Sequence, residues 1–287
     1  MTRLSPRIAA CLAATWFIWG STYLAMKFAL LSFPPFLQSG TRFLFAGSLL
    51  LTWARWRGQL MPTLLQWRNA LVVGSLMLAA NVGGVAYAEQ SLASGLVVAF
   101  IAIVPALITV ASLPFGLRPA RIEVIGIALG FFGVLLLVRG EAFISSPIGV
   151  LAIVTAALGW STGSVLSQHV LRLAPASAGF ASAMLCAGGV LMALSLMSGE
   201  SFTWPPQPLA IAAWLYLSVF GSVIAYSAYM TLLANTRPAL ATSNSFVNPV
   251  IAMLLGVSLG GERVTLHEWL AVGVIVLGVT VLVVSRR

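Results

Sequence analysis

The sequence of 287 residues contains no aspartate and few charged side chains of any kind. Charged residues make up 7% of the chain, whereas hydrophobic residues make up 60%. A chain this apolar cannot cover itself with a water-facing surface, because burying its hydrophobic residues would leave too little polar surface to surround them. The composition therefore excludes an ordinary soluble protein and indicates an integral membrane protein.

The residues that carry most enzyme chemistry are equally scarce. Lys27 is the only lysine, so the sequence holds no phosphate-binding Gly-Lys-Ser/Thr loop. His169 and His267 fall at expected helix ends and have no matching acidic or metal-binding cluster. Cys11 and Cys186 fall within apolar segments and are interpreted as packing residues. We therefore expect no catalytic residue, no metal, no cofactor and no enzymatic activity.

What the sequence does contain is ten apolar segments of helix length. Such segments span a membrane as helices, since only a helix satisfies its own backbone hydrogen bonds there. The connections between them are short, so we expect an all-α integral membrane protein with ten transmembrane helices in a single membrane domain, residues 1–287. The segments are expected at residues 8–31, 35–54, 69–88, 93–113, 122–138, 148–171, 177–198, 210–233, 239–259 and 267–284.

The second half of the chain repeats the first. The motif Trp19-Gly20-Ser21-Thr22 is echoed by Gly159-Trp160-Ser161-Thr162, and Ala86-Tyr87 is echoed by Ala225-Tyr226. Pro105 and Pro249 interrupt the fourth and the ninth segment. Each half contains five of the ten segments. Because five is an odd number, the second copy crosses the membrane in the opposite sense to the first. Two inverted repeats, about 1–142 and 143–287, around a central cavity are typical of secondary transporters.

The net charge of +9 reflects the orientation of the chain in the membrane and does not indicate binding to nucleic acid. With the N-terminus inside, only Arg139 and Arg263 fall in outer loops. Such an asymmetry follows the positive-inside rule and predicts cytoplasmic termini in a multi-pass protein. The cytoplasmic segments would then hold Arg3, Arg7, Arg55, Arg57, Arg68, Arg118, Arg121, Arg172, Arg237, Arg286 and Arg287.

Several polar residues fall near the middle of the expected helices, where they are costly unless they face a partner or a water-filled cavity. The densest group is the run from Thr242 to Pro249, in which Asn244 and Asn248 share one helix face. This run either lines a cavity or forms hydrogen bonds between helices. Ser and Thr at such depths either line a cavity or pack against neighbouring helices.

Deep aromatic residues complete the expected site. A buried indole N–H group needs a hydrogen-bond acceptor. This need favours a cavity role over simple packing for Trp19 and Trp160. The expected substrate-binding residues are Trp19, Thr22, Asn81, Tyr87, Phe100, Trp160, Thr162, Tyr226, Asn244 and Asn248. Pro105 and Pro249 are expected as hinges, the alternative being static kinks.

Two cations are expected within the membrane. Lys27 lies near a helix end, from which it can snorkel to the surface. For Arg42 we expect a structural tie to a backbone carbonyl or to Glu89, with substrate contact as the alternative. No glutamate falls near the middle of a helix, where a proton relay would be expected. We therefore expect transport down the substrate gradient without an imposed pH gradient.

Several of these residues together resemble a known family. They are Trp19-Gly20-Ser21 followed by Lys27, Arg42-Phe43, Pro249, and Gly261-Glu262-Arg263. In this order they resemble the EamA-type drug/metabolite transporter superfamily, and within it the bacterial YddG-type amino-acid exporters. The sequence departs from the family pattern at Asn248, where a glutamate often precedes the proline, and at Leu117, where the first repeat would place an acidic residue.

The resemblance implies a ten-helix carrier of the bacterial inner membrane that works by alternating access. Its helices 1, 3, 4, 6, 8 and 9 would line the cavity, and it would export amino acids or similar small amphiphilic metabolites. The expected partners are a small-molecule substrate and the lipid bilayer, with the protein a monomer or a weak homodimer. The alternatives are a transporter of nucleotide sugars, purines or drugs, or a non-transporting membrane scaffold or channel subunit.

Overall fold

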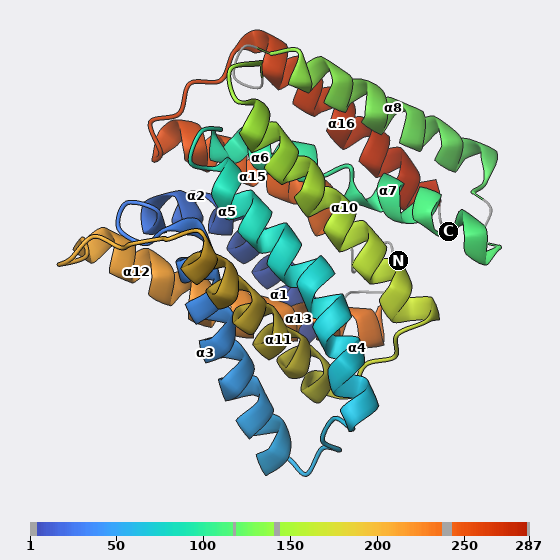
Figure 1. Cartoon of the computed structure of the whole chain (residues 1–287). Helices are drawn as coiled ribbons and strands as arrows, with labels where there is room; N and C mark the ends of the chain where they lie inside the picture. The colour runs from blue at the N-terminus through green and yellow to red at the C-terminus, as the bar shows by residue number, and fades with distance from the viewer. Residues whose placement is uncertain (1–4, 117–118, 141–143, 237–242, 286–287) are drawn as a thin grey trace.

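A computed structural model describes residues 5–116, 119–140, 144–236 and 243–285, and every regular element in these ranges is a helix. The helices form a single bundle (Figure 1). In the first half they are α1 (Pro6–Ala13), η1 (Ala14–Ile18), α2 (Trp19–Ala29), α3 (Pro35–Trp56), α4 (Leu64–Gly74), η2 (Ser75–Gly83), α5 (Gly84–Ala88), α6 (Ser94–Ile101), α7 (Val104–Ala111), η3 (Leu113–Phe115) and α8 (Arg121–Val138). In the second half they are α10 (Pro147–His169), α11 (Ala176–Met197), α12 (Pro208–Tyr216), η4 (Leu217–Ile224), α13 (Ala225–Asn235), α15 (Asn244–Ser258) and α16 (Leu266–Ser285).

These elements join into ten helical segments within the described residues, five in each half, of which the fourth is interrupted between α6 and α7. By length and composition, 7 of them are long and apolar enough to cross a membrane, and two shorter apolar helices cover Val247–Ser258 and Leu266–Val281. The expected all-α fold is confirmed, and the helix ends lie within a few residues of the expected ones.

Proline residues and side-chain hydroxyl groups at the first turns explain where several of the helices begin. Proline has no N–H to leave unpaired, so it suits the first turn of a helix. The hydroxyl of Thr63 accepts from the backbone N–H of Gln66 at 3.3 Å, and the Gln66 side chain accepts from the N–H of Thr63 at 2.9 Å. The helices with proline in the first two positions are α1, α3, α7, α10 and α12.

Glycines let the two halves approach each other closely at two helix pairs on opposite sides of the bundle, α8 with α16 and α3 with α11 (Figure 1). A Cβ on Gly278 would lie 2.6 Å from the backbone nitrogen of Gly130, and one on Gly133 would lie 2.8 Å from that of Ile275. On the other side, a Cβ on Gly188 would lie 3.0 Å from the backbone nitrogen of Leu44. Small residues at such contacts are how membrane helices associate without a hydrophobic driving force between them.

Three of the long helices contain a π-helical segment. Two of these segments, η2 and η4, occupy corresponding places in the third helix of each half. The other, η1, lies immediately before Trp19 in the first helix. A π-helical turn shifts the register of the helix face and is frequent at functional sites.

The two expected hinge prolines behave differently. The fourth helix is interrupted between α6 and α7, and Pro105 lies in the first turn of α7. Pro249 lies inside α15, which continues through it. Hinge motion at either residue stays a prediction, but only the Pro105 region has a break in the helix.

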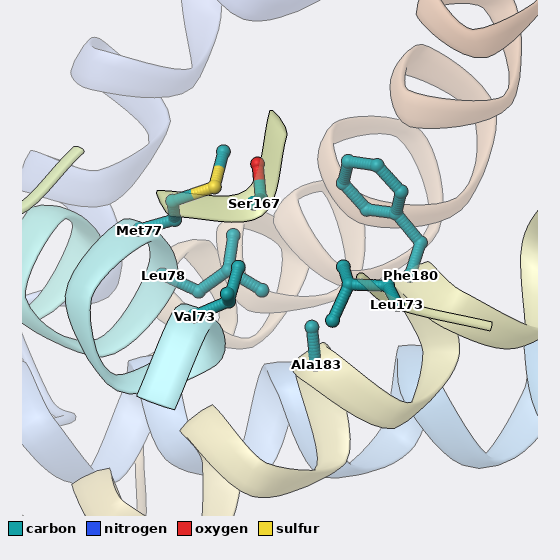
Figure 2. Close-up of a pocket in the computed structure, with 7 residues that line it drawn as sticks. All are labelled: Val73, Met77, Leu78, Ser167, Leu173, Phe180 and Ala183. Atoms are coloured by element: carbon teal, nitrogen blue, oxygen red, sulfur yellow. The ribbon is translucent and has the colours of Figure 1, made fainter. Parts of the chain in front are cut away.

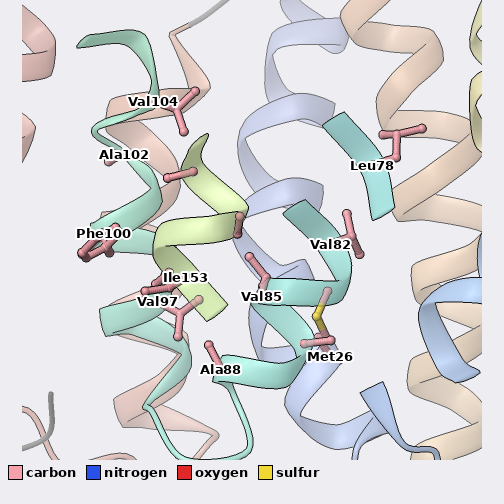
Figure 3. Packing of buried hydrophobic residues seen from close by; sticks show 14 of the residues in the cluster. Met26, Leu78, Val82, Val85, Ala88, Val97, Phe100, Ala102, Val104 and Ile153 are labelled. Carbon is pink, nitrogen blue, oxygen red and sulfur yellow. The ribbon is translucent and has the colours of Figure 1, made fainter. Parts of the chain in front are cut away.

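The buried core lies between the halves. Figure 3 shows α10 between α6 and α5, with Ile153 of α10 near Val97 and Val85. Ile153 and Val97 are fully buried, and Val85 is nearly so. Helices of both repeats therefore share one core, and the residues described next lie around it.

Candidate functional site

An aromatic cluster lies where the first helix meets the eighth. The Trp19 indole N–H donates to the backbone carbonyl of Gly221 in η4 at 3.2 Å. The Trp19 ring lies 5.1 Å from that of Tyr226 and 5.2 Å from that of Tyr229, and Phe180 of α11 lies 5.4 Å from Tyr226. The four rings Trp19, Phe180, Tyr226 and Tyr229, called here the aromatic cluster, come from three helices of both repeats. They offer a large apolar surface with polar edges.

Arg42 of α3 lies beside this cluster and is 5% exposed. Its Nε donates to the hydroxyl of Ser222 in η4 at 2.6 Å, and its guanidinium carbon lies 5.3 Å from the centre of the Phe43 ring. The terminal nitrogen Nη2 lies close to Gly221, 3.5 Å from where a Cβ would stand. In the described part of the chain, neither terminal nitrogen of Arg42 has a hydrogen-bond acceptor.

This placement changes the interpretation of Arg42. The expected tie to Glu89 or to a backbone carbonyl is wrong, because the partner is a serine hydroxyl on η4. A guanidinium has five N–H donors, and here only one of them is used. The unused donors give Arg42 the capacity to bind a carboxylate through two parallel hydrogen bonds.

A small cavity of about 60 Å³ opens next to the aromatic cluster. Figure 2 shows Phe180 and Leu173 on one side of it, facing Val73, Leu78 and Met77 on the other. Ser167 and Ala183 complete the lining. A volume of this size holds a few water molecules and not a metabolite. None of the expected substrate-binding residues lines it, but Phe180 belongs to both the cavity and the aromatic cluster.

The polar run of the ninth helix is used mainly for contact with the first helix. The Ser243 hydroxyl accepts from the indole N–H of Trp16 at 2.8 Å. With its amide oxygen and nitrogen exchanged, the orientation that satisfies both atoms, Asn248 donates to the backbone carbonyls of Trp16 and Asn244, both at 3.2 Å. These bonds correspond to the helix–helix alternative for this run. Thr242 lies outside the described residues.

The remaining expected residues are spread over the bundle. The Thr22 hydroxyl donates to the carbonyl of Trp19 at 2.7 Å, and its methyl group faces Gly221 next to the aromatic cluster. The amide of Asn81 donates to the carbonyl of Ala156 at 3.2 Å and so ties η2 to α10. Tyr87 stacks on Phe36 at 5.9 Å.

Phe100 and Trp160 pack within the shared core. Thr162 is exposed on the same face of α10 as Leu151 and Leu158, which is a face suited to lipid. Of the ten expected residues, the structure therefore brings together Trp19, Thr22 and Tyr226 around Arg42, and it does not place Thr162 with them.

One end of the bundle is held together by contacts of Glu262 with Lys27, Ser94 and Gly95, and we call it the ion-pair end. Glu262, in the connection between α15 and α16, accepts from Lys27 Nζ of α2 at 2.8 Å. The same carboxylate accepts from the backbone N–H groups of Ser94 at 2.9 Å and Gly95 at 3.3 Å, which form the start of α6. Burial acts to raise the pKa of Glu262, but the hydrogen bonds from Lys27 and Ser94 outweigh it and hold that pKa below its ordinary value. Lys27 is thus paired and does not simply snorkel.

Comparison with known proteins supports the two-repeat arrangement. The model of the EamA-like transporter family matches residues 7–139 and again residues 147–284. The "Uncharacterized inner membrane transporter YedA" of Escherichia coli strain K12 is 41% identical over 285 residues, which cover 99% of this chain and 92% of that protein. The "Uncharacterized transporter sll0355" of Synechocystis is 28% identical over 94% of this chain and 88% of that protein.

A solved crystal structure shares the fold with a TM-score of 0.69, at 22% sequence identity, over 98% of this chain and 99% of the other. These relatives establish the family and leave the amino-acid-exporter subgroup a prediction. Since the family model matches both halves and nearly the whole chain, this protein belongs to the EamA-like transporter family.

Proposed function

We propose that the protein exports small amphiphilic metabolites bearing a carboxylate, with amino acids as the leading class, across the bacterial inner membrane. Arg42 would bind the carboxylate, and the aromatic cluster would receive the apolar part of the molecule. The inner-membrane location is taken from the relative in Escherichia coli, whose name states it. Both termini would lie in the cytoplasm, as the arginine distribution predicts.

The observation that carries this proposal is the unused hydrogen-bonding capacity of Arg42. A buried guanidinium is costly unless its charge is compensated. Within the described residues its only hydrogen bond is to the neutral hydroxyl of Ser222. A substrate carboxylate would supply the missing charge and two acceptors. This proposal places the carboxylate at Arg42 and not at the expected substrate-binding residues Asn244 and Asn248, because the Asn248 amide, in its satisfied orientation, donates within the protein.

Alternating access is supported by the size of the cavity. The cavity of about 60 Å³ is too small for an amino acid, and Arg42, which does not line it, is 5% exposed, so a substrate would reach Arg42 only when the helices move apart. The glutamate contacts of the ion-pair end join α2 and α6 of the first repeat to the α15–α16 connection of the second. Breaking and re-forming such contacts would open and close that end of the pathway.

The test is a competition panel on purified protein in proteoliposomes. Uptake of a mixture of radiolabelled amino acids is measured, and unlabelled amino acids, their carboxamide analogues, nucleotide sugars, purines and cationic drugs are added as competitors. We expect amino acids to compete and their carboxamides to compete at least tenfold less well, since they lack the charge that Arg42 binds. Equal competition by the carboxamides would contradict the role of Arg42. Absence of uptake for every labelled amino acid would contradict the substrate class.

A further inference from the structure

The glutamates of the described residues fall into two groups. Four of the five accept hydrogen bonds from the backbone N–H groups at the start of a helix, where the helix dipole favours a negative charge. These four are Glu123 on Ala120, Glu200 on Phe36 and Leu37, Glu262 on Ser94 and Gly95, and Glu268 on Thr265. Glu89 is the exception and has no such role.

Glu89 is buried and has no hydrogen-bond partner among the described residues. It directly follows Ala88, the last residue of α5, at the ion-pair end of the third helix. The residue is 5% exposed, and neither carboxyl oxygen has a donor. An ionised carboxylate without donors or water is strongly disfavoured, whereas a neutral carboxylic acid is tolerated.

The charged groups around Glu89 favour its neutral form. Glu262 of the α15–α16 connection acts on it repulsively, Lys27 of α2 acts attractively, and Tyr23 of α2 also lies within electrostatic range. Burial raises the pKa of Glu89 well above its ordinary value, repulsion from Glu262 adds to the rise, and Lys27 offsets part of it. The positive charge of Lys27 is already engaged by Glu262 at 2.8 Å.

The other elements near Glu89 add no compensating charge. Helix α10 packs along α5 and has no charged residue before His169 at its far end, and α6 has none at all. The only charged residue in the first half of α3 is Arg42, which bonds to Ser222. Burial, the lack of a hydrogen-bond donor and these neighbours thus all favour the neutral form of the Glu89 carboxyl group.

We propose that Glu89 is a proton-binding site whose occupancy is linked to closure of the ion-pair end. When this end opens, water reaches the carboxyl group and the proton dissociates. When it closes, Glu89 takes up one proton from the solution on that side. Such a site would supply the proposed carrier with a coupling ion. The role of the proton in transport therefore rests on the proposed function, whereas the proton-binding site itself is tested without any transport assay.

This proposal is the opposite of the expectation that transport needs no pH gradient. That expectation rested on depth along the helix, which places Glu89 at an end. Depth does not decide solvation, because Glu89 is 5% exposed although it directly follows the end of α5. The buried carboxyl group is therefore a reason to expect coupling even without a glutamate at the middle of a helix.

The pH dependence follows from the two forms of the carboxyl group. Its proton affinity is ordinary in the open form and raised in the closed form. The contribution of Glu89 to closure is therefore fully present below the ordinary pKa of a glutamate, about 4.3, and is lost as pH rises through the raised pKa. Within this window, one linked proton lowers the ratio of closed to open molecules by up to about tenfold per pH unit.

Two measurements on the purified protein test the site without any substrate. Infrared spectroscopy detects the carbonyl stretch of a protonated carboxylic acid. Spin labels report closure when placed at Leu31 and Leu266, which are exposed, follow α2 and begin α16, and belong to different repeats. The labelled protein carries serine in place of Cys11 and Cys186.

Glu89→Gln is the variant to compare, because glutamine is the same size and mimics the neutral acid. We expect the native protein to show a carboxylic-acid band at pH values above the ordinary pKa of a glutamate, about 4.3, and an opening that increases as pH rises further. Glu89→Gln should lose the band and stay closed as pH rises over this range. The control Glu123→Gln, whose amide oxygen can still accept from Ala120, should retain both the band and the opening. A band that survives in Glu89→Gln, or an unchanged pH dependence of the label distance, would overturn the proposal.

Discussion

Replacing Glu262 by glutamine should open the ion-pair end. The native carboxylate accepts from Lys27 at 2.8 Å, from Ser94 at 2.9 Å and from Gly95 at 3.3 Å. Glutamine has one acceptor oxygen in place of two and no charge, so at least one of these bonds is lost and the remaining ones weaken. Hydrogen bonds to charged groups contribute about 1.5–3 kcal/mol each.

Part of this loss is recovered by water. The Lys27 side chain is 34% exposed, so its ammonium group can be hydrated when its partner is removed. We therefore expect a net cost of about 2–3 kcal/mol to the closed form, which shifts the ratio of closed to open molecules by about 30- to 150-fold. Because Glu262 joins the two repeats, this cost applies mainly to the closed form.

The assay is the distance between spin labels at Leu31 and Leu266 in Glu262→Gln, measured beside the native protein and Glu123→Gln. The expected result is a population at longer distance in Glu262→Gln alone. The thermal unfolding midpoint should change little, since the open form is still folded. An unchanged distance distribution would refute the role of Glu262 in holding this end closed.

Two further predictions concern packing and pH. Gly278→Ala places a Cβ 2.6 Å from the backbone nitrogen of Gly130. It should destabilise the α8–α16 contact by about 1–3 kcal/mol in a thermal unfolding assay, whereas Gly273→Ala, which meets nothing within 4 Å, should not. Equal midpoints for the two variants would contradict the close approach. The closed form should also be lost again in strong acid, because the lowered pKa of Glu262 keeps its contribution present above the ordinary glutamate pKa and removes it as pH falls through the lowered value. Closure measured by the spin labels should therefore peak at mildly acidic pH, while a steady increase down to the lowest pH would contradict this. Glu89→Gln should retain only the loss of closure in strong acid.

Much of the fold could be predicted because each signal for it is local. Proline at the start of α3 and α10 and the long apolar runs between polar connections give the helix bounds directly. The matched Pro105 and Pro249 showed the repeat. What the sequence could not show is that α6 ends before Pro105 while α15 continues through Pro249, because this depends on how each helix is packed.

The site was harder to predict, because depth along a helix does not give the direction of a side chain. Thr162 matches Thr22 in the repeat, yet Thr162 is exposed and Thr22 is buried against η4. Phe180 was missed because a phenylalanine in an apolar helix has no distinguishing pattern. The serine partner of Arg42 was missed because it is 180 residues away in the sequence. Contacts between repeats decide these points, and a single sequence does not reveal them.

The most direct test of the account is the transport activity of Arg42→Gln. Uptake of whichever amino acid the competition panel identifies is measured in proteoliposomes, beside Arg55→Gln, which changes an exposed arginine of the same helix. Glutamine keeps one uncharged donor, so a net loss of about one charge-assisted hydrogen bond, about 1.5–3 kcal/mol, predicts uptake with an apparent affinity about 10- to 150-fold weaker in Arg42→Gln and unchanged in Arg55→Gln. Native affinity in Arg42→Gln would contradict the claim that the buried guanidinium binds the substrate carboxylate.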